Sequence, residues 1–260
     1  MRLKLLFLSI LGTAFILTNG CFERRYGTMT ASEMFPDPKV RALAEAGASG
    51  DIKAIDRAIA AGADVNATGK DGVTPLFWAI ASTYNFEGFE YLLKKGADPN
   101  ISPTTDNHST VMDLAAWGKD IRFLYAAIRA GGDVNLVSPY FRYNGTPIFF
   151  ATMGRNIKSV ALLLANGAQI DFQNSNGRTP LMTNDGDYYT VYYLLKMGAD
   201  PFLTTKTGHT IWADVLVSQK RMDPDSESYY WLGKVIELLK QKGSQPNQQD
   251  LKLAEGTRPR

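Results

Sequence analysis

Side chains with the types and spacing needed for catalysis or metal binding are scarce in this chain. It has two histidines, His108 and His209, far apart in the sequence, and a single cysteine, Cys21. No set of cysteines and histidines has the spacing of a zinc site. No G-x-S-x-G motif, phosphate-binding loop or H-E-x-x-H pair is present. The sequence therefore predicts no metal site and no cofactor.

Carboxylates are common, but four of them recur at one position of a repeating pattern. Asp64, Asp98, Asp133 and Asp200 each lie two residues after a glycine. A carboxylate that recurs once per unit is more economically a turn-capping group than a catalytic one. We therefore expect a protein that is not an enzyme.

The elements that must position these residues are tandem units with two shared markers. A closing segment, such as AAGADVN ending at Asn66, places glycines at 62, 96, 131, 167 and 198, which are 34, 35, 36 and 31 residues apart. A degenerate sixth copy contains Gly243. An opening segment, such as TPLFWAI from Thr74 or TPIFFAT from Thr146, keeps the same period. Two independent markers with one period indicate tandem repeats.

Each marker suits one end of a helix. Pro75, Pro147 and Pro180 stand where the first turn of a helix needs no N–H, and the threonine before each can cap that helix. The closing glycines stand where a second helix must end in a left-handed residue. Apolar residues recur at helical spacing between the markers, so each unit reads as a helix pair that needs its neighbours to bury its apolar face.

Both markers resemble the ankyrin repeat, whose signature is T-P-L-H-x-A in the first helix and G-A-D-V-N after the second. The resemblance covers residues 39–243. It implies an all-α fold, an ankyrin-repeat solenoid of about six helix-turn-helix units with short β-hairpin fingers. The pairs Asp71–Gly72, Asn144–Gly145 and Asn176–Gly177 are expected at the fingertips.

The chain departs from the family signature in several units. The histidine position holds Phe77, Asp113, Phe149, Met182 and Ala213, so these units must rely more on apolar packing. The fifth unit lacks a clean first helix, because residues 183–190 (TNDGDYYT) are rich in helix breakers. The sixth is stretched by a charged insert over residues 219–228, and we expect this unit to cap the array. Residues 244–260 are predicted to be a polar tail.

The first 20 residues read as an export signal. Arg2 and Lys4 precede the apolar stretch Leu5–Leu17, which is too short for a transmembrane helix, and Cys21 follows small or polar residues. This arrangement resembles a bacterial lipoprotein signal, although Thr18 stands where that family prefers leucine. It implies cleavage after residue 20, acylation of Cys21 with a lipid such as palmitate, and a tether over residues 21–38. An ordinary secretory signal with an incidental cysteine, or an uncleaved anchor, remain alternatives.

The same resemblance predicts where the protein resides. All three alternatives place the folded part on the periplasmic side of a bacterial envelope. Phe22, rather than aspartate, follows the cysteine, which favours the outer membrane over the inner one.

The charge balance argues against a nucleic-acid partner. Without Arg2 and Lys4 the chain carries 26 basic and 26 acidic residues. Binding to a phosphate backbone usually needs a basic stripe, and no such run is present. The expected partner is another protein, the membrane contact is the lipid anchor alone, and the free protein is expected to be a monomer.

Ankyrin arrays bind partners with their fingertips and inner helices, so the resemblance selects candidate residues by position. On the inner helices these are Trp117 and Met153. Tyr, Trp, Phe and Arg are the types enriched at binding hot spots, and the long third finger (136–145) carries three aromatics. The fingertip candidates are Lys70, Asp71, Tyr140, Phe141, Tyr143, Arg178 and His209. The alternative for each aromatic residue is packing within the array.

Small exported ankyrin lipoproteins resemble two kinds of protein. One is the immunity protein of a type VI or other contact-dependent secretion system, which binds and blocks a toxic effector such as a phospholipase in the periplasm. The other is a periplasmic ankyrin protein that supports an oxidant-defence enzyme. An envelope scaffold or adaptor is a third reading, and we favour the immunity protein among the three.

Overall fold

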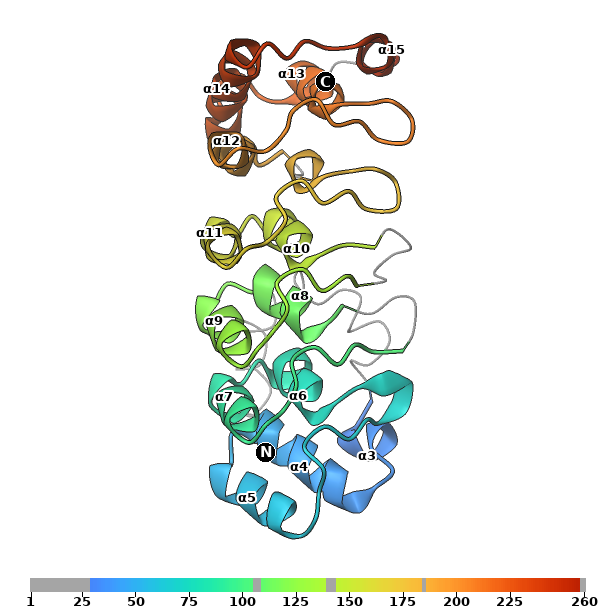
Figure 1. Cartoon of the computed structure of the whole chain (residues 1–260), viewed down its shortest axis with the longest axis vertical. Helices are drawn as coiled ribbons and strands as arrows, with labels where there is room; N and C mark the ends of the chain where they lie inside the picture. Colours follow the sequence, from blue (N-terminus) through green and yellow to red (C-terminus); the bar gives the residue numbers. More distant parts are fainter. Residues whose placement is uncertain (1–28, 105–108, 139–143, 184–185, 258–260) are drawn as a thin grey trace, which may run out of the picture.

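The computed structural model describes residues 29–104, 109–138, 144–183 and 186–257. The predicted signal segment and Cys21 lie outside these ranges. Within them the chain forms an elongated stack of helix pairs, with an inner and an outer column of helices and a row of loops beside the inner column (Figure 1). The expectation of an all-α repeat array is confirmed.

Successive units each contribute one inner and one outer helix. The pairs are α4 (Pro38–Ser49) with α5 (Ile52–Ala60), α6 (Pro75–Trp78) with α7 (Phe86–Lys94), α8 (Val111–Trp117) with α9 (Ile121–Arg129), α10 (Pro147–Met153) with α11 (Ile157–Ala165), the 3-10 helix η4 (Pro180–Met182) with α12 (Tyr188–Lys196), and α13 (Ile211–Arg221) with α14 (Glu227–Gln241). The helix α6 continues as the π-helical segment η2 (Ala79–Thr83).

The closing marker acts at helix ends as predicted, and the opening marker does so in part. The hydroxyls of Thr74 and Thr110 accept from the backbone N–H groups three residues later, each at 3.1 Å. The hydroxyls of Thr146 and Thr179, which precede Pro147 and Pro180, form no such cap bond. All six closing glycines have positive φ, between 76° and 102°. Since such angles are costly for residues with a Cβ, glycine is favoured at these helix ends.

One side chain per unit joins each of the first three units to the next. An asparagine amide donates to the carbonyl of the next closing glycine, and its oxygen accepts from the N–H two residues beyond that glycine. The donor distances are 3.1 Å from Asn66 to Gly96, 3.0 Å from Asn100 to Gly131 and 3.1 Å from Asn135 to Gly167. We call these three side chains the asparagine ladder. The recurring aspartates turn inward on their own loops, as expected of turn caps: Asp64, Asp98 and Asp133 each accept from the N–H two residues later at 2.8–2.9 Å.

The fourth unit breaks the ladder. Asp171 takes the asparagine position and still accepts from the backbone N–H of Asp200 at 2.9 Å. A carboxylate has no amide to donate, so the bond to the carbonyl of Gly198 has no counterpart here. The joint between the fourth and fifth units therefore has one hydrogen bond fewer than the joints before it.

The apolar core runs the length of the stack between the two helix columns. Four of the five residues at the family's histidine position, Phe77, Phe149, Met182 and Ala213, are apolar and buried. The fifth, Asp113, is fully buried, and its carboxylate accepts from the backbone N–H of Thr110 at 2.8 Å. Burial raises the pKa of the Asp113 carboxyl to about 7 despite that hydrogen bond.

The last two units show the predicted irregularities. The fifth has only the 3-10 turn η4 in place of an inner helix. The charged insert of the sixth is shorter than expected: residues 219–221 complete α13 and residues 227–228 begin α14, which leaves 222–226 as the connection. The hydroxyl of Ser226 caps α14 by accepting from the N–H of Tyr229 at 3.2 Å.

Two segments expected to be unpacked are part of the fold. Within the predicted tether, the short helix α3 (Ala31–Met34) precedes a buried Phe35, whose ring meets Trp78 edge-on with centroids 5.9 Å apart. Within the predicted polar tail, α15 (Gln248–Glu255) packs against α13. The polar composition of this segment led to the prediction of an unpacked tail, but its contacts with the array are themselves polar. The buried Asp250 accepts from the backbone N–H and the hydroxyl of Thr210 at 2.9 and 2.7 Å.

The fingers are tight loops, not strand pairs, in the part of the chain that the structure covers. They close through bonds such as Gly69 N–H to Val73 O at 2.8 Å, and Asp71 and Gly72 have φ of 57° and 77°. One isolated antiparallel bridge, Ser138 to Gly145, lies at the base of the third finger. No helix in the described ranges is long and apolar enough to cross a membrane.

Candidate partner-binding face

The two inner-helix candidates lie at the C-terminal ends of α8 and α10. Trp117 is half-buried, and its ring centroid lies 6.3 Å from that of Phe150. Met153 is half-buried as well. Trp117 therefore contributes to the packing between units and leaves only part of its surface for a partner.

The first finger presents one candidate and uses the other in its own turn. Lys70 is exposed in the short turn η1 (Lys70–Gly72). Asp71 is half-buried, and its carbonyl accepts from the backbone N–H of Thr104 in the next finger at 2.9 Å. Backbone bonds of this kind hold neighbouring fingers side by side.

The three aromatic candidates of the third finger, Tyr140, Phe141 and Tyr143, lie outside the described residues. The base of this finger is described: Ser138 and Gly145 exchange backbone hydrogen bonds of 2.8 and 3.0 Å. Asn144 beside it has a positive φ of 43°, as expected for a fingertip residue.

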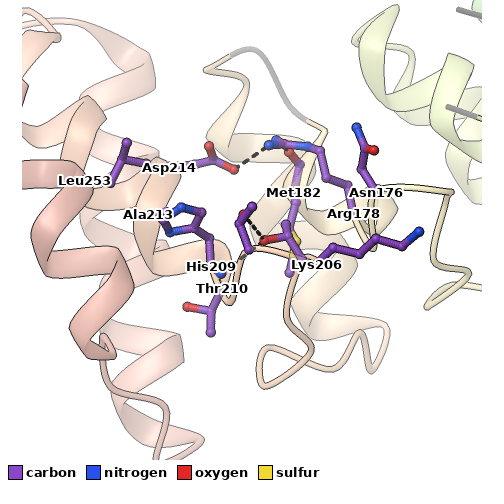
Figure 2. A pocket seen from close by; sticks show the side chains of 11 residues that line it. Asn176, Arg178, Met182, Lys206, His209, Thr210, Ala213, Asp214 and Leu253 are labelled. Atoms are coloured by element: carbon purple, nitrogen blue, oxygen red, sulfur yellow. Dashed lines mark hydrogen bonds and ion pairs between the residues drawn. The ribbon is translucent and has the colours of Figure 1, made fainter. Parts of the chain in front are cut away.

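The structure brings the remaining two candidates, Arg178 and His209, into one groove. They come from the fourth and fifth fingers, and the groove between them has a volume of about 310 Å³ (Figure 2). Lys206 and Asp214 also line it, and Leu253 of α15 lies at one side. We call this site, defined by Arg178, Lys206, His209 and Asp214, the basic groove.

Neighbouring elements fix the shape of the basic groove. The backbone N–H of Lys206 donates to the carbonyl of Asn176 at 2.9 Å, which ties the fifth finger to the fourth. Within the fifth finger, the N–H of Thr205 donates to the carbonyl of His209 at 2.8 Å. The side chains at the groove thus project from loops held by main-chain bonds at both ends.

The groove carries more positive than negative charge. The guanidinium of Arg178 lies 3.2 Å from a carboxylate oxygen of Asp214 and also donates to the carbonyl of Met182. Lys206 is exposed and forms no ion pair within the described ranges. The Nδ1 atom of His209 is buried without a described hydrogen-bond partner, 3.9 Å from Asp250.

This arrangement suits recognition of an acidic group. The guanidinium of Arg178 and the exposed ammonium of Lys206 line one concave surface with a single carboxylate, that of Asp214, and this excess of positive charge favours binding of carboxylates. The described residues contain no cluster of three His, Cys, Asp or Glu side chains that could hold a metal ion.

Sequence reasoning missed Lys206 and Asp214. A signal for Lys206 was present, because it occupies the same position before the finger glycine as Lys70, which the sequence did select. Asp214 had no comparable signal, since its place beside Arg178 depends on how α13 packs against the fourth finger.

Comparison with known proteins points to one family. Family models described as "Ankyrin repeats (many copies)" and "Ankyrin repeats (3 copies)" match residues 41–93 and 111–205. The ankyrin repeat protein YahD of Escherichia coli is 30% identical over 62% of this chain and 81% of its own length. The mitochondrial disaggregase of Bos taurus is 32% identical over 56% of this chain, and the phosphocholine transferase AnkX of Legionella pneumophila is 29% identical over 51%. This chain spans only 21% and 14% of those two proteins.

Two solved structures have a similar fold. The ankyrin repeat protein EF0377 aligns with a TM-score of 0.61 and 24% identity, over 78% of this chain and 98% of its own. A chain of the complex between the predatory endopeptidase Bd0816 of Bdellovibrio bacteriovorus and the immunity protein Bd3460 aligns with a TM-score of 0.61 and 24% identity, over 74% of this chain and 97% of its own.

Proposed function

This chain belongs to the ankyrin repeat family, and we propose that it is an envelope lipoprotein that binds and blocks a secreted toxic effector such as a phospholipase. The coarser part of this statement, a protein-binding role, follows from the family. The effector, the lipid anchor at Cys21 and the periplasmic location are the parts we propose.

The observation that carries the proposal is the basic groove. Arg178 and His209, chosen from the sequence as partner contacts, line one concave site together with the exposed Lys206. Main-chain bonds between the fingers hold this site in shape before any partner arrives. A preorganised surface loses little ordering entropy on association, which favours tight one-to-one binding.

Inhibition by such a protein needs no chemistry of its own. A rigid surface that covers the active site or the membrane-facing side of an effector blocks access of its substrate. A chain from a complex of an endopeptidase with an immunity protein has a similar fold at 24% identity, so a fold of this kind occurs in such a complex.

The predicted anchor suits the same role. A chain acylated at Cys21 would be held at the membrane, where a phospholipase attacks. Replacement of this residue, Cys21→Ala, is expected to leave a folded but unanchored protein, measured by cell fractionation after feeding of labelled palmitate. A wild-type chain that takes up no label, with membrane retention unchanged in the variant, would contradict the anchor.

The first experiment is capture of partners with tagged residues 22–260 from the secreted and envelope fractions of the source organism. Recovery of a secreted toxin in equal amount, followed by loss of its activity on addition of this chain, would support immunity. Recovery of a detoxifying enzyme or of resident envelope proteins alone would favour the oxidant-defence or scaffold roles and overturn it.

The partner then tests the site. The charge reversal Lys206→Glu in the groove should weaken binding by about tenfold or more, because the position would repel an acidic group. The matched control Lys158→Glu, an exposed lysine on the outer helix α11, should bind as the wild type does. Equal affinities of the two variants would remove the basic groove from the interface.

The third finger is tested in the same assay. The pair Tyr140→Ala and Tyr143→Ala is expected to weaken partner binding and to leave the melting temperature nearly unchanged. A large fall in melting temperature would mean that these rings pack within the array instead.

A further inference from the structure

The last outer helix is longer than the others. The helices α5, α7, α9, α11 and α12 each have 9 residues, whereas α14 has 15. When the units are aligned on their closing glycines, the additional residues fall at the start of α14 and include Tyr229, Tyr230 and Trp231. No repeat marker accounts for these extra turns.

The extension builds an aromatic cluster with the neighbouring helix α12. The indole of Trp231 lies 4.7 Å from the ring of Tyr189, 5.4 Å from that of Tyr192 and 5.4 Å from that of Tyr230, measured between centroids. We call these four side chains the outer aromatic cluster. Tyr189 and Tyr230 are 43% and 58% exposed, so the cluster faces solvent and does not complete the core.

Lysines border the cluster. Tyr192, Tyr230 and Trp231 line a groove of about 330 Å³ together with Lys196 and Lys234. The ammonium of Lys234 lies 5.8 Å from the centre of the Tyr230 ring and 3.1 Å from a carboxylate oxygen of Glu237. Lys196 is exposed and has no ion pair among the described residues, so the groove has an excess positive charge.

We propose that the outer aromatic cluster and its lysines form a contact surface for a lipid bilayer with anionic headgroups. Tyrosine and tryptophan favour the boundary between water and hydrocarbon, because each has an apolar ring with a polar tip. Lysine stems lie along such rings while the ammonium groups reach the phosphates.

The position of the cluster leaves the partner-binding face free. The outer helix column lies on the side of the array away from the fingers (Figure 1). Contact through α12 and α14 would therefore hold the array against a membrane with its fingers pointing away from it. This inference goes beyond the proposed function and requires neither the effector nor acylation of Cys21.

The test is co-sedimentation of residues 22–260 with vesicles of phosphatidylethanolamine and phosphatidylglycerol. This segment lacks Cys21, so no lipid anchor contributes to binding. This segment contains every packed element that the structure describes, from α3 to α15. Binding is expected, weaker in high salt and weaker to phosphatidylcholine vesicles, which lack net charge. A wild-type segment that stays in solution with the anionic vesicles would overturn the proposal.

Matched variants locate the contact. The pair Tyr189→Ser and Tyr230→Ser should reduce vesicle affinity by about tenfold, and Lys196→Glu by about fivefold or more. The control is Tyr125→Ser on α9, which removes a tyrosine of similar exposure, 52%, outside the cluster. Circular dichroism checks that each variant is folded.

Two outcomes separate this inference from the proposed function. A cluster variant that loses vesicle binding but keeps affinity for a captured effector would support the lipid contact, whatever that effector is. A cluster variant that loses only the protein partner, while its vesicle binding equals that of the wild type, would show a protein interface and refute the lipid contact.

Discussion

Asp171 marks a weakened polar joint of the array and offers a way to strengthen it. In the first three units the equivalent asparagine makes two bonds to the following unit, as Asn135 does with Gly167 and Gln169 at 3.1 and 2.8 Å. Asp171 keeps the acceptor bond, from the N–H of Asp200 at 2.9 Å, so its side chain already has the ladder orientation. By analogy with Asn135, we expect its second oxygen to take the place of the amide nitrogen beside the carbonyl of Gly198, where two acceptors would repel.

The substitution Asp171→Asn should therefore stabilise the protein. It replaces a repulsion between acceptors with one hydrogen bond at a partly exposed site, which is worth about 1 kcal/mol. For a domain of this size that corresponds to a rise of about 2–4 °C in melting temperature. Thermal unfolding followed by far-ultraviolet circular dichroism measures the rise, and urea unfolding gives the free energy.

Two further variants make the reasoning refutable. Asn135→Asp introduces the same defect one unit earlier and should destabilise by about 1 kcal/mol. Asp225→Asn removes one negative charge from the exposed connection before α14 and controls for net charge. If Asp171→Asn melts no higher than Asp225→Asn, or if Asn135→Asp melts at the wild-type temperature, the side-chain amide at this position does not stabilise the joint between units.

Three other variants test the backbone, the C-terminal clamp and the buried acid. Gly96→Ala should lower the free energy of unfolding by only about 1 kcal/mol, because φ is 91° at this position but an added Cβ meets no atom within 4 Å. Gly88→Ala should lower it by more in the same urea titration, because the added Cβ would overlap the backbone of α4. Asp250→Ala leaves the buried donors of Thr210 unpaired and should cost about 2–4 kcal/mol, with earlier proteolysis within α15 as a second readout. The pKa of Asp113 is about 7 in the folded protein, above its unfolded value near 4, so the native state holds a proton that the unfolded chain releases, and stability should fall as pH rises from about 4 to 7. Asp113→Asn should flatten that fall and stabilise the protein at pH 8; an unchanged pH profile would contradict the assignment.

The repeat markers predicted most of the fold because they act locally. A proline after a threonine starts a helix and a glycine of positive φ ends one, and neither depends on distant residues. The stack followed because a lone helix pair cannot bury its apolar face. The missing inner helix of the fifth unit was predicted from a local signal as well, the helix breakers in residues 183–190.

The segments at both ends escaped prediction because their packing depends on contacts across the fold. Phe35 is buried against residues far along the chain, among them Trp78, whose ring it meets edge-on. Asp250 is buried because the cap of α13 at Thr210 offers it two donors, and a polar sequence such as QPNQQD carries no hydrophobic period that would reveal this. Net polarity distinguishes mobile tails from packed ones poorly when the packing is made of hydrogen bonds.

The basic groove was half visible in the sequence. Arg178 and His209 could be chosen as fingertip residues, but not as neighbours, because their proximity depends on the stacking of two fingers. Lys206 joins them for the same reason, through the bond from its N–H to Asn176. The repeat pattern predicts which residues occupy equivalent finger positions, but only the structure shows which of them lie close enough to form one site.

The clamp formed by α15 has a consequence for how such a chain can change in length. Asp250 and Asn247 occupy the donors of Thr210 and the carbonyl of Gly208, groups that a following finger would otherwise meet. A newly duplicated unit added after α14 would have to displace α15 before it could stack. Lineages of this protein should therefore gain or lose units between the first and last pairs, with α15 kept beside the last pair while the number of interior units varies.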